Sequence, residues 1–251
     1  MWQDTEIQPI SHAALLALVE NRIPAVRIAD FASREEAGQL ATALAERACR
    51  TNSIKQVTRL GISQYQQGLR VSKSNYFTLA RQLDAEFSRI YSSSFSPVQR
   101  LINQLDGLGF DVAVMSEPGF GHYFAGNGKL RNGSSPIHVD YAPQDSAGWA
   151  IAQARAQLAW NVYLDIPEQG GELLLWDKQW EPQDDEFQTD DSYFYQDEVV
   201  RGAQMLRLKV YPGEVIIINS RNFHAVAEAE DRLAFGSFIG VFEHNLLRFW
   251  S

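Results

Sequence analysis

The sequence is poor in cysteine and in long apolar runs. Its 251 residues include one cysteine, Cys49, so no disulfide can form within the chain, and a reducing compartment is favoured. No stretch reaches the length needed to span a membrane, and the first ten residues lack the basic and apolar regions of a secretory signal. These features predict a cytoplasmic protein without a membrane segment.

Basic residues are also scarce. There are 22 Lys and Arg against 31 Asp and Glu, which gives a formal net charge of −9. Because nucleic-acid phosphates require a basic surface, we do not expect nucleic acid as a partner. The negative charge is compatible with a cationic or zwitterionic small-molecule substrate. The apolar fraction of 45% is ample for a packed core.

The first third of the chain is mainly helical in pattern. Apolar periodicity and composition divide it into a helix over 11–23, a strand over 24–31, a helix over 33–50 and two helices within 76–109. Ser33 and Glu36 have the spacing of a capping box at the start of the third segment. The dipeptide Ser96-Pro97 separates the last two helices.

After residue 110 the pattern changes to short runs rich in β-branched and aromatic residues. Pro, Gly, Asn and Asp separate these runs, which are DVAVMSEP, IHVDYAP, QLAWNVYLDIP, GELLLWDK, RLKVYPG, EVIIINS, HAVAEAE and RLAFGSFIGVF. Such a series predicts an antiparallel jelly roll. We therefore expect one α+β domain over 1–251. Helices of the mainly helical part, 1–109, would pack on one face of a double-stranded β-helix, or cupin-like, core over 110–251.

An acidic and aromatic insertion interrupts the β region at 181–198. It contains eight Asp or Glu, four aromatic residues and no Lys or Arg. One interpretation is a solvated surface loop between strands. The other is a lid over the open end of the barrel, with its acids facing a cationic substrate and its aromatic side chains excluding water.

A candidate metal site begins with His138 and Asp140 in "IHVDY". In a strand, residues two apart face the same side, so both could chelate one ion. His224, after the apolar run EVIIINS, is the best third ligand. Two histidines and a carboxylate suit a non-heme Fe(II) oxygenase, and they also suit a catalytic zinc. Arg232 could grip the distal carboxylate of a keto acid chelating iron, or form a surface salt bridge with an adjacent acid.

From residue 110 to 243 the sequence resembles the 2-oxoglutarate- and Fe(II)-dependent oxygenase superfamily. The resemblance rests on His138-x-Asp140, "YLDIPEQGGELLLW", "VYPGEVIIINS", "HAV" from His224, and Arg232, in that order. It implies Fe(II) as the cofactor and 2-oxoglutarate and O2 as cosubstrates. His138, Asp140 and His224 would be the iron ligands, Arg232 would bind the 2-oxoglutarate C5 carboxylate, and Asn161 would contact the cosubstrate. The family often has Gly before the basic residue, where this chain has Asp231.

Within the superfamily the layout is similar to stand-alone enzymes that hydroxylate or chlorinate free amino acids, notably lysine. The related halogenases have Gly or Ala in place of Asp140, which leaves room for chloride. The carboxylate here therefore implies a hydroxylase of an unactivated C–H bond that releases succinate and CO2. Residues that could contact the amino-acid substrate are Glu117, His122, Tyr141 and Asp145.

Three alternatives remain open at this point. A protein hydroxylase of prolyl-hydroxylase type would bind an extended peptide in an exposed groove. A zinc hydrolase on a cupin-like barrel would need a general base, and no Glu or His stands in an obvious position for one. A non-catalytic barrel that binds a small acid would not need a complete ligand set.

Overall fold

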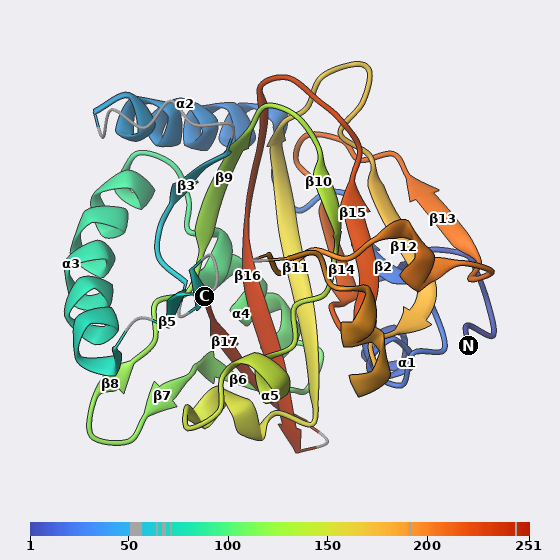
Figure 1. Cartoon of the computed structure of the whole chain (residues 1–251). Helices are drawn as coiled ribbons and strands as arrows, with labels where there is room; N and C mark the ends of the chain where they lie inside the picture. Colours follow the sequence, from blue (N-terminus) through green and yellow to red (C-terminus); the bar gives the residue numbers. More distant parts are fainter. Residues whose placement is uncertain (51–56, 64, 67–68, 71, 191, 244) are drawn as a thin grey trace.

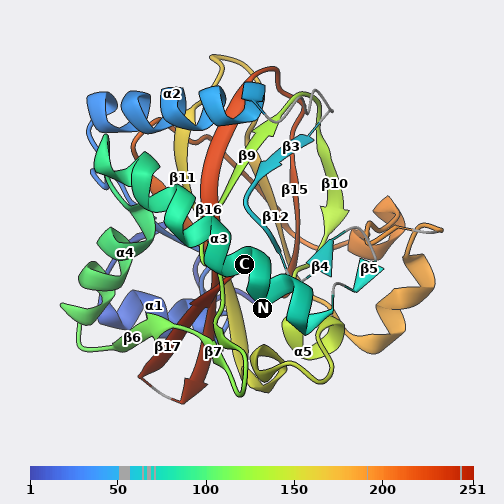
Figure 2. The same cartoon turned by 90° about the vertical axis from the view of Figure 1, so that its left-hand side faces the viewer.

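The structure, a computed structural model, describes residues 1–50, 57–63, 65–66, 69–70, 72–190, 192–243 and 245–251. Two sheets face each other, and helices cover the outer face of the larger one (Figures 1 and 2). This is the expected α+β arrangement with a jelly-roll core. The Cys49 side chain lies outside the described part. Across the described residues, no helix combines the length and apolar character needed to cross a membrane.

Four helices form most of the N-terminal part. They are α1 (His12–Val19), α2 (Arg34–Arg50), α3 (Lys73–Ser92) and α4 (Pro97–Asp106), close to the predicted segments. The capping box of α2 is confirmed: the Glu36 N–H donates to Ser33 Oγ at 3.1 Å, and the Ser33 N–H donates to the Glu36 carboxylate at 2.9 Å. Ser96 caps α4, whose first residue is Pro97. Local sequence signals therefore fix where these helices begin.

The larger sheet runs through most of the molecule. Its strands, in order, are β1 (Gln8–Pro9), β2 (Ala25–Ile28), β14 (Val215–Asn219), β11 (Ala156–Asp165), β16 (Arg232–Glu243), β17 (Leu246–Trp250) and β6 (Asp111–Val114). Strand β9 (Asn127–Arg131) pairs with β16 and with β3 (Val57–Leu60). The central pairs, β14 with β11 and β11 with β16, are antiparallel. Strands β1, β3, β9 and β17 were not predicted from the sequence.

The smaller sheet is antiparallel throughout. Its order is β10 (Ser135–His138), β15 (Asn222–Val226), β12 (Leu173–Gln179) and β13 (Met205–Leu208). The remaining short elements are β4 (Tyr65–Gln66), β5 (Leu69–Arg70), β7 (Ser116–Glu117), β8 (Gly121–His122), α5 (Ala142–Asp145), η1 (Ala150–Gln153), η2 (Pro182–Phe187) and η3 (Asp197–Val200).

Alternation along β11 divides the core into layers. Leu158, Trp160 and Val162 pack against the helices, whereas Ala159 and Tyr163 belong to the cluster between the sheets. A third cluster covers the outer face of the smaller sheet, where residues of the 180–200 region pack on β10 and β15 through Trp180, Tyr195, Val199 and Val200. The helices therefore support the large sheet from outside, and the space between the sheets is left for the site.

Candidate metal centre and surrounding cavity

Three potential metal ligands converge at one end of the smaller sheet. His138 ends β10 and lies opposite His224 of β15 in register, and their ring centroids are 4.2 Å apart. Asp140 Oδ2 lies 3.4 Å from His224 Nε2 and 4.0 Å from His138 Nε2. One donor atom from each of the three residues falls within 4.8 Å of the others. A single ion placed between them could contact all three.

The expectation that His138 and Asp140 alternate within one strand needs correction. Strand β10 ends at His138, and Asp140 lies in the loop that follows. Its position is fixed by β14 instead. The Asp140 N–H donates to the Ser220 carbonyl at 2.9 Å, and Ser220 Oγ donates to the Asp140 carbonyl at 2.7 Å. The carboxylate reaches the histidines because Ser220, the residue after β14 of the larger sheet, holds its backbone.

The hydrogen bonds of both imidazoles suit metal binding. His138 Nδ1 lies 2.8 Å from the Pro136 carbonyl, and His224 Nδ1 lies 2.9 Å from the Asn222 carbonyl. A carbonyl can only accept, so each Nδ1 carries the proton and each Nε2 offers a lone pair. Burial lowers the pKa of His138 to about 3, which keeps its ring neutral. Neutral imidazoles beside a carboxylate are a donor set that Fe(II) and zinc both accept.

The carboxylate of Asp140 is ionised. Burial by itself would raise its pKa, but the adjacent His224 and His138 side chains and the charge of Lys129 outweigh burial and hold the pKa well below the ordinary value. Asp140 therefore faces the two imidazoles as an anion across the whole neutral range. The residues present fit a divalent cation.

Arg232 is buried at the start of β16, with 4% of its surface exposed. Its Nε donates to the Gly171 carbonyl at 3.2 Å, and its guanidinium carbon lies 5.2 Å from the centre of the Tyr163 ring. Within the described ranges no carboxylate lies at ion-pair distance from it, so the alternative of a surface salt bridge is not observed. A buried cation without a counter-ion is costly, and an anionic ligand would offset that cost.

The residue before Arg232 adopts an unusual backbone conformation. Asp231 has φ of 52°, in the left-handed region that favours glycine, and its N–H donates to Asn132 Oδ1 at 2.6 Å. Aspartate tolerates this region better than most residues do. The strand therefore begins with the same turn that Gly would permit, although the residue differs from the family pattern.

His138, Asp140 and His224 make up the metal-ligand group. A cavity of about 890 Å³, including the space at its mouth, lies beside it. Predicted site residues in its lining are His138, Asp140, Asn161, Tyr141 and Asp145. Lys129 and Arg131 also line it, and sequence reasoning missed both. The signal was available in "NGKLR", where polar side chains at alternate positions of 127–131 indicate a strand with one polar face.

Arg232 stands behind this lining rather than in it. In the antiparallel register it pairs with Arg131, and Lys129 pairs with Ala234, so the three cations occupy one face of β9 and β16. Tyr163, another residue that sequence reasoning missed, pairs with Ala234 from the other side. One wall of the cavity is therefore cationic, with Lys129 and Arg131 in its lining and Arg232 behind them.

Two of the proposed substrate contacts lie elsewhere. The Glu117 carboxylate is bound by Lys73, by the Tyr123 hydroxyl and by the Ala150 N–H, so it joins α3 to the β7–η1 region. His122 is exposed on β8, where its Nδ1 lies 2.9 Å from Ser116 Oγ. Neither residue lines the cavity.

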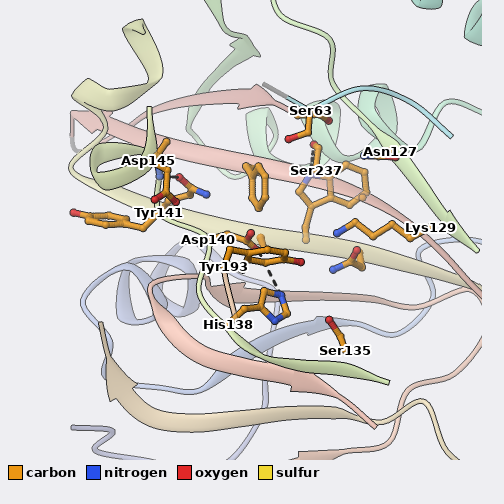
Figure 3. Close-up of a pocket in the computed structure, with 18 of the residues that line it drawn as sticks. Ser63, Asn127, Lys129, Ser135, His138, Asp140, Tyr141, Asp145, Tyr193 and Ser237 are labelled. Atoms are coloured by element: carbon orange, nitrogen blue, oxygen red, sulfur yellow. Dashed lines mark hydrogen bonds and ion pairs between the residues drawn. The ribbon is translucent and has the colours of Figure 1, made fainter. Parts of the chain in front are cut away.

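The acidic and aromatic insertion reaches the metal-ligand group. The Tyr193 ring lies 5.4 Å from the His138 ring, and the Phe194 ring lies 6.0 Å from it. Asp185 anchors the segment by accepting hydrogen bonds from Trp180 Nε1 at 2.8 Å and from the Tyr195 hydroxyl at 3.1 Å. Tyr193 also lines the cavity, as Figure 3 shows. Part of this insertion therefore closes the site, while most of its acids remain outside.

Comparison with known proteins gives three informative matches. The family model of the carrier-protein-independent halogenase WelO5 matches residues 4–251. Leucinostatins biosynthesis cluster protein S of Purpureocillium lilacinum is 34% identical over 193 residues, which are 72% of this chain and 78% of that protein. L-γ-glutamyl-L-propargylglycine hydroxylase of Streptantibioticus cattleyicolor is 31% identical over 154 residues, 59% and 57% of the two chains.

The fold also matches solved structures. A crystal structure of an N-substituted L-amino acid dioxygenase from Burkholderia ambifaria superimposes with a TM-score of 0.66 at 16% identity, covering 96% of this chain and 91% of that one. At this identity the likeness concerns the fold, and it agrees with the jelly roll described above.

Proposed function

Because this chain belongs to the carrier-protein-independent halogenase WelO5 family, within the 2-oxoglutarate- and Fe(II)-dependent oxygenases, we propose that it hydroxylates a C–H bond of an amino-acid substrate. The resemblance noted in the sequence is confirmed at the level of the superfamily, and with it Fe(II), 2-oxoglutarate and O2. Bound together, these supply the oxidising power for C–H hydroxylation, with succinate and CO2 as coproducts.

The observation that carries the proposal is the convergence of His138, Asp140 and His224. These residues would hold the iron through two imidazole nitrogens and one carboxylate oxygen, a ligand set that suits Fe(II) oxygen chemistry. The carbonyls of Pro136 and Asn222 orient the imidazoles, and Ser220 orients the aspartate. The protein thereby presents the ligands in the correct protonation state before the metal binds.

The cationic side of the site, which comprises Lys129 and Arg131 of β9 and Arg232 of β16, receives 2-oxoglutarate. Arg232 binds the C5 carboxylate, since its guanidinium is buried and meets no carboxylate of the described chain. The Tyr163 ring packs beneath the guanidinium and limits its movement. Asn161 contacts the cosubstrate from β11, and Lys129 lies near enough to the metal-ligand group to influence the pKa of both His138 and Asp140.

Hydroxylation is favoured over chlorination because Asp140 supplies a charged third ligand. A chloride would need the coordination position that this carboxylate occupies. The matching family is named for a halogenase, whereas one relative is a hydroxylase. The proposal of hydroxylation therefore rests on the carboxylate at position 140.

An enclosed small substrate fits the cavity better than an extended peptide. Tyr193 and Phe194 stand beside His138 and narrow the site, whereas a prolyl-hydroxylase-type enzyme needs an open groove. The resemblance to lysine-type enzymes makes free L-lysine the first compound to test.

The test is anaerobic loading with Fe(II), followed by incubation with 2-oxoglutarate, O2 and a panel of free amino acids. We expect succinate in proportion to a product that has gained one oxygen atom. Zinc-dependent hydrolysis, or binding of 2-oxoglutarate without turnover, would contradict the proposal.

A further inference from the structure

The lining of the cavity includes a buried amide on β11, that of Gln157. Along this strand Gln157, Ala159 and Asn161 share the face between the sheets, and all three line the cavity. Ala159, the residue in the middle, is small and leaves room for a ligand above the strand. Gln157 and Asn161 are four residues apart, which is roughly 13 Å along an extended strand. A substrate at Gln157 and a cosubstrate at Asn161 can therefore occupy the cavity together.

The orientation of the Gln157 amide is determined by its hydrogen bond. Gln157 is 2% exposed, and its Oε1 accepts a hydrogen bond from the Ala142 N–H at 2.8 Å. Turning the amide over would place Nε2 against this N–H, and two donors cannot bond to each other. Oε1 is therefore the atom that faces Ala142, and Nε2 is the arm of the amide that remains for another partner.

The Nε2 atom carries two N–H donors. Among the described residues, none accepts a hydrogen bond from it. Gln157 lines the cavity, so these donors are available to a bound ligand. A largely buried donor without a partner is costly, and an acceptor on a ligand would satisfy it.

Gln157 is held next to the metal-ligand group by Ser220. The Ser220 N–H donates to the Gln157 carbonyl at 3.1 Å, and Ser220 Oγ donates to the Asp140 carbonyl at 2.7 Å. Ala142, to which the Gln157 side chain is bonded, lies two residues after Asp140. The contacts that hold Asp140 therefore also hold this amide, and they bring a ligand bound by Nε2 close to the metal-ligand group.

The chemistry of an amino acid decides which of its groups fits Nε2. An N–H donor needs an acceptor, and a free amino acid offers its carboxylate, whereas its ammonium group only donates. The charge of a carboxylate makes this hydrogen bond stronger than one to a neutral carbonyl. The cations Lys129, Arg131 and Arg232 lie on β9 and β16, on the side of the site that receives 2-oxoglutarate. Beside α5, the donor available to a second carboxylate is Gln157.

We propose that Gln157 donates through Nε2 to the carboxylate of the amino-acid substrate and is a specificity-determining residue of this enzyme. The inference rests on the proposed function and makes it more specific, because it states which end of the substrate lies beside Ala142. Gln157 thereby selects free amino acids over the corresponding primary amides, whose neutral carbonyl makes a weaker hydrogen bond.

The variant Gln157→Glu removes the donor and keeps the acceptor. Its carboxylate can still accept from the Ala142 N–H, but it has no N–H to donate, and its charge repels a substrate carboxylate. The standard free amino acids are first screened for turnover by wild type. The best substrate is then compared with its primary amide in wild type and variant at about pH 8, well above the ordinary pKa of glutamate.

We expect wild type to prefer the acid to the amide, with kcat/KM at least about tenfold higher. Because a charge-assisted hydrogen bond is lost, Gln157→Glu should lower kcat/KM for the acid roughly 10- to 100-fold, mainly through KM. The amide should lose much less, since its N–H groups can donate to the new carboxylate. A merely structural role would lower both values alike and leave their ratio unchanged. Anaerobic binding of 2-oxoglutarate, measured by thermal unfolding, should stay as in wild type.

Gln99→Glu is the matched control, because it makes the same chemical change at an exposed position of α4, outside the cavity. It should leave the ratio of acid to amide intact. Gln157→Met is a second variant, which removes the donors without adding a charge, and it should also reduce this ratio.

Three results would overturn the inference and leave the proposed function standing. They are an unchanged ratio in both Gln157 variants, a wild-type preference for the amide, and a loss of 2-oxoglutarate binding in place of a higher KM for the acid. Absence of 2-oxoglutarate-dependent product from all the amino acids, in wild type, would count against the proposed function itself.

Discussion

Replacement of Arg232 by Met separates the cost of burying a cation from its value in binding a cosubstrate. The guanidinium is 4% exposed and meets a carbonyl and an aromatic ring, but no carboxylate of the described chain. A Met side chain of similar length removes the desolvation penalty along with the charge. We therefore expect the ligand-free variant to unfold with a free energy within about 1 kcal/mol of wild type.

The effect on 2-oxoglutarate should be much larger. Loss of a charge-assisted contact is worth about 1.5–3 kcal/mol, which weakens binding roughly 10- to 150-fold. A ligand present at 100 times its Kd stabilises a protein by about 2.7 kcal/mol. If Arg232→Met weakens binding 100-fold, the same concentration would stabilise the variant by only about 0.4 kcal/mol.

The assay is thermal unfolding of the anaerobic Fe(II) enzyme over a series of 2-oxoglutarate concentrations. Arg201→Met provides a control, because Arg201 is an exposed cation paired with Glu198 at 3.0 Å, outside the cavity. The control should keep the full stabilisation. If Arg232→Met also keeps it, the carboxylate is held by Lys129 or Arg131, and the assignment of Arg232 is wrong.

Three further predictions follow from individual contacts. In high chloride, wild type should give only hydroxylated product, whereas Asp140→Gly should lose hydroxylation and bind iron more weakly. Product mass and iron content check this. Chlorinated product from wild type would show that Asp140 is not a metal ligand. Tyr193→Ala should raise the ratio of succinate to hydroxylated product, because water gains access beside His138. An unchanged ratio would show that Tyr193 does not help to exclude water from the site. Hydrogen bonds with Arg100 and Ser33 lower the pKa of Glu36 to about 2 from 4.5, so its ionised form stabilises the fold above pH 4.5 and this stability is lost towards pH 2. Glu36→Gln should therefore reduce the loss of stability between pH 4.5 and pH 2, and an unchanged acid-unfolding profile would contradict this.

Much of the fold could be predicted because its signals are local. The Ser33–Glu36 capping box and the Ser96-Pro97 break position α2 and α4 through contacts a few residues apart. Strand β9 was missed because "NGKLR" contains Gly and shows only the short polar alternation of Asn127, Lys129 and Arg131, and because its pairing with β3 and β16 depends on residues far along the chain. Such pairing leaves little trace in a short window of sequence.

The site, like the fold, could be predicted where its signals are local and not where distant residues determine it. The spacing of His138 and Asp140 pointed to two members of the candidate metal centre, yet strand alternation does not position Asp140. Ser220, the residue after β14, does. The role of the 181–198 segment was ambiguous because its acids and its aromatic residues point to different environments. In the fold the Tyr193 ring lies against the His138 ring, a contact that only tertiary packing can determine.

The most direct test of the central claim is iron content measured together with product formation in wild type and in His224→Ala. His224 is 5% exposed and supplies one of the three converging donor atoms, and its replacement leaves most of the core unchanged. We predict one Fe(II) per wild-type chain after anaerobic loading, and succinate formation coupled to a product with one added oxygen. His224→Ala should keep its fold by circular dichroism and lose both iron and turnover. A variant that retains iron and hydroxylates at the wild-type rate would contradict the assignment of the metal centre.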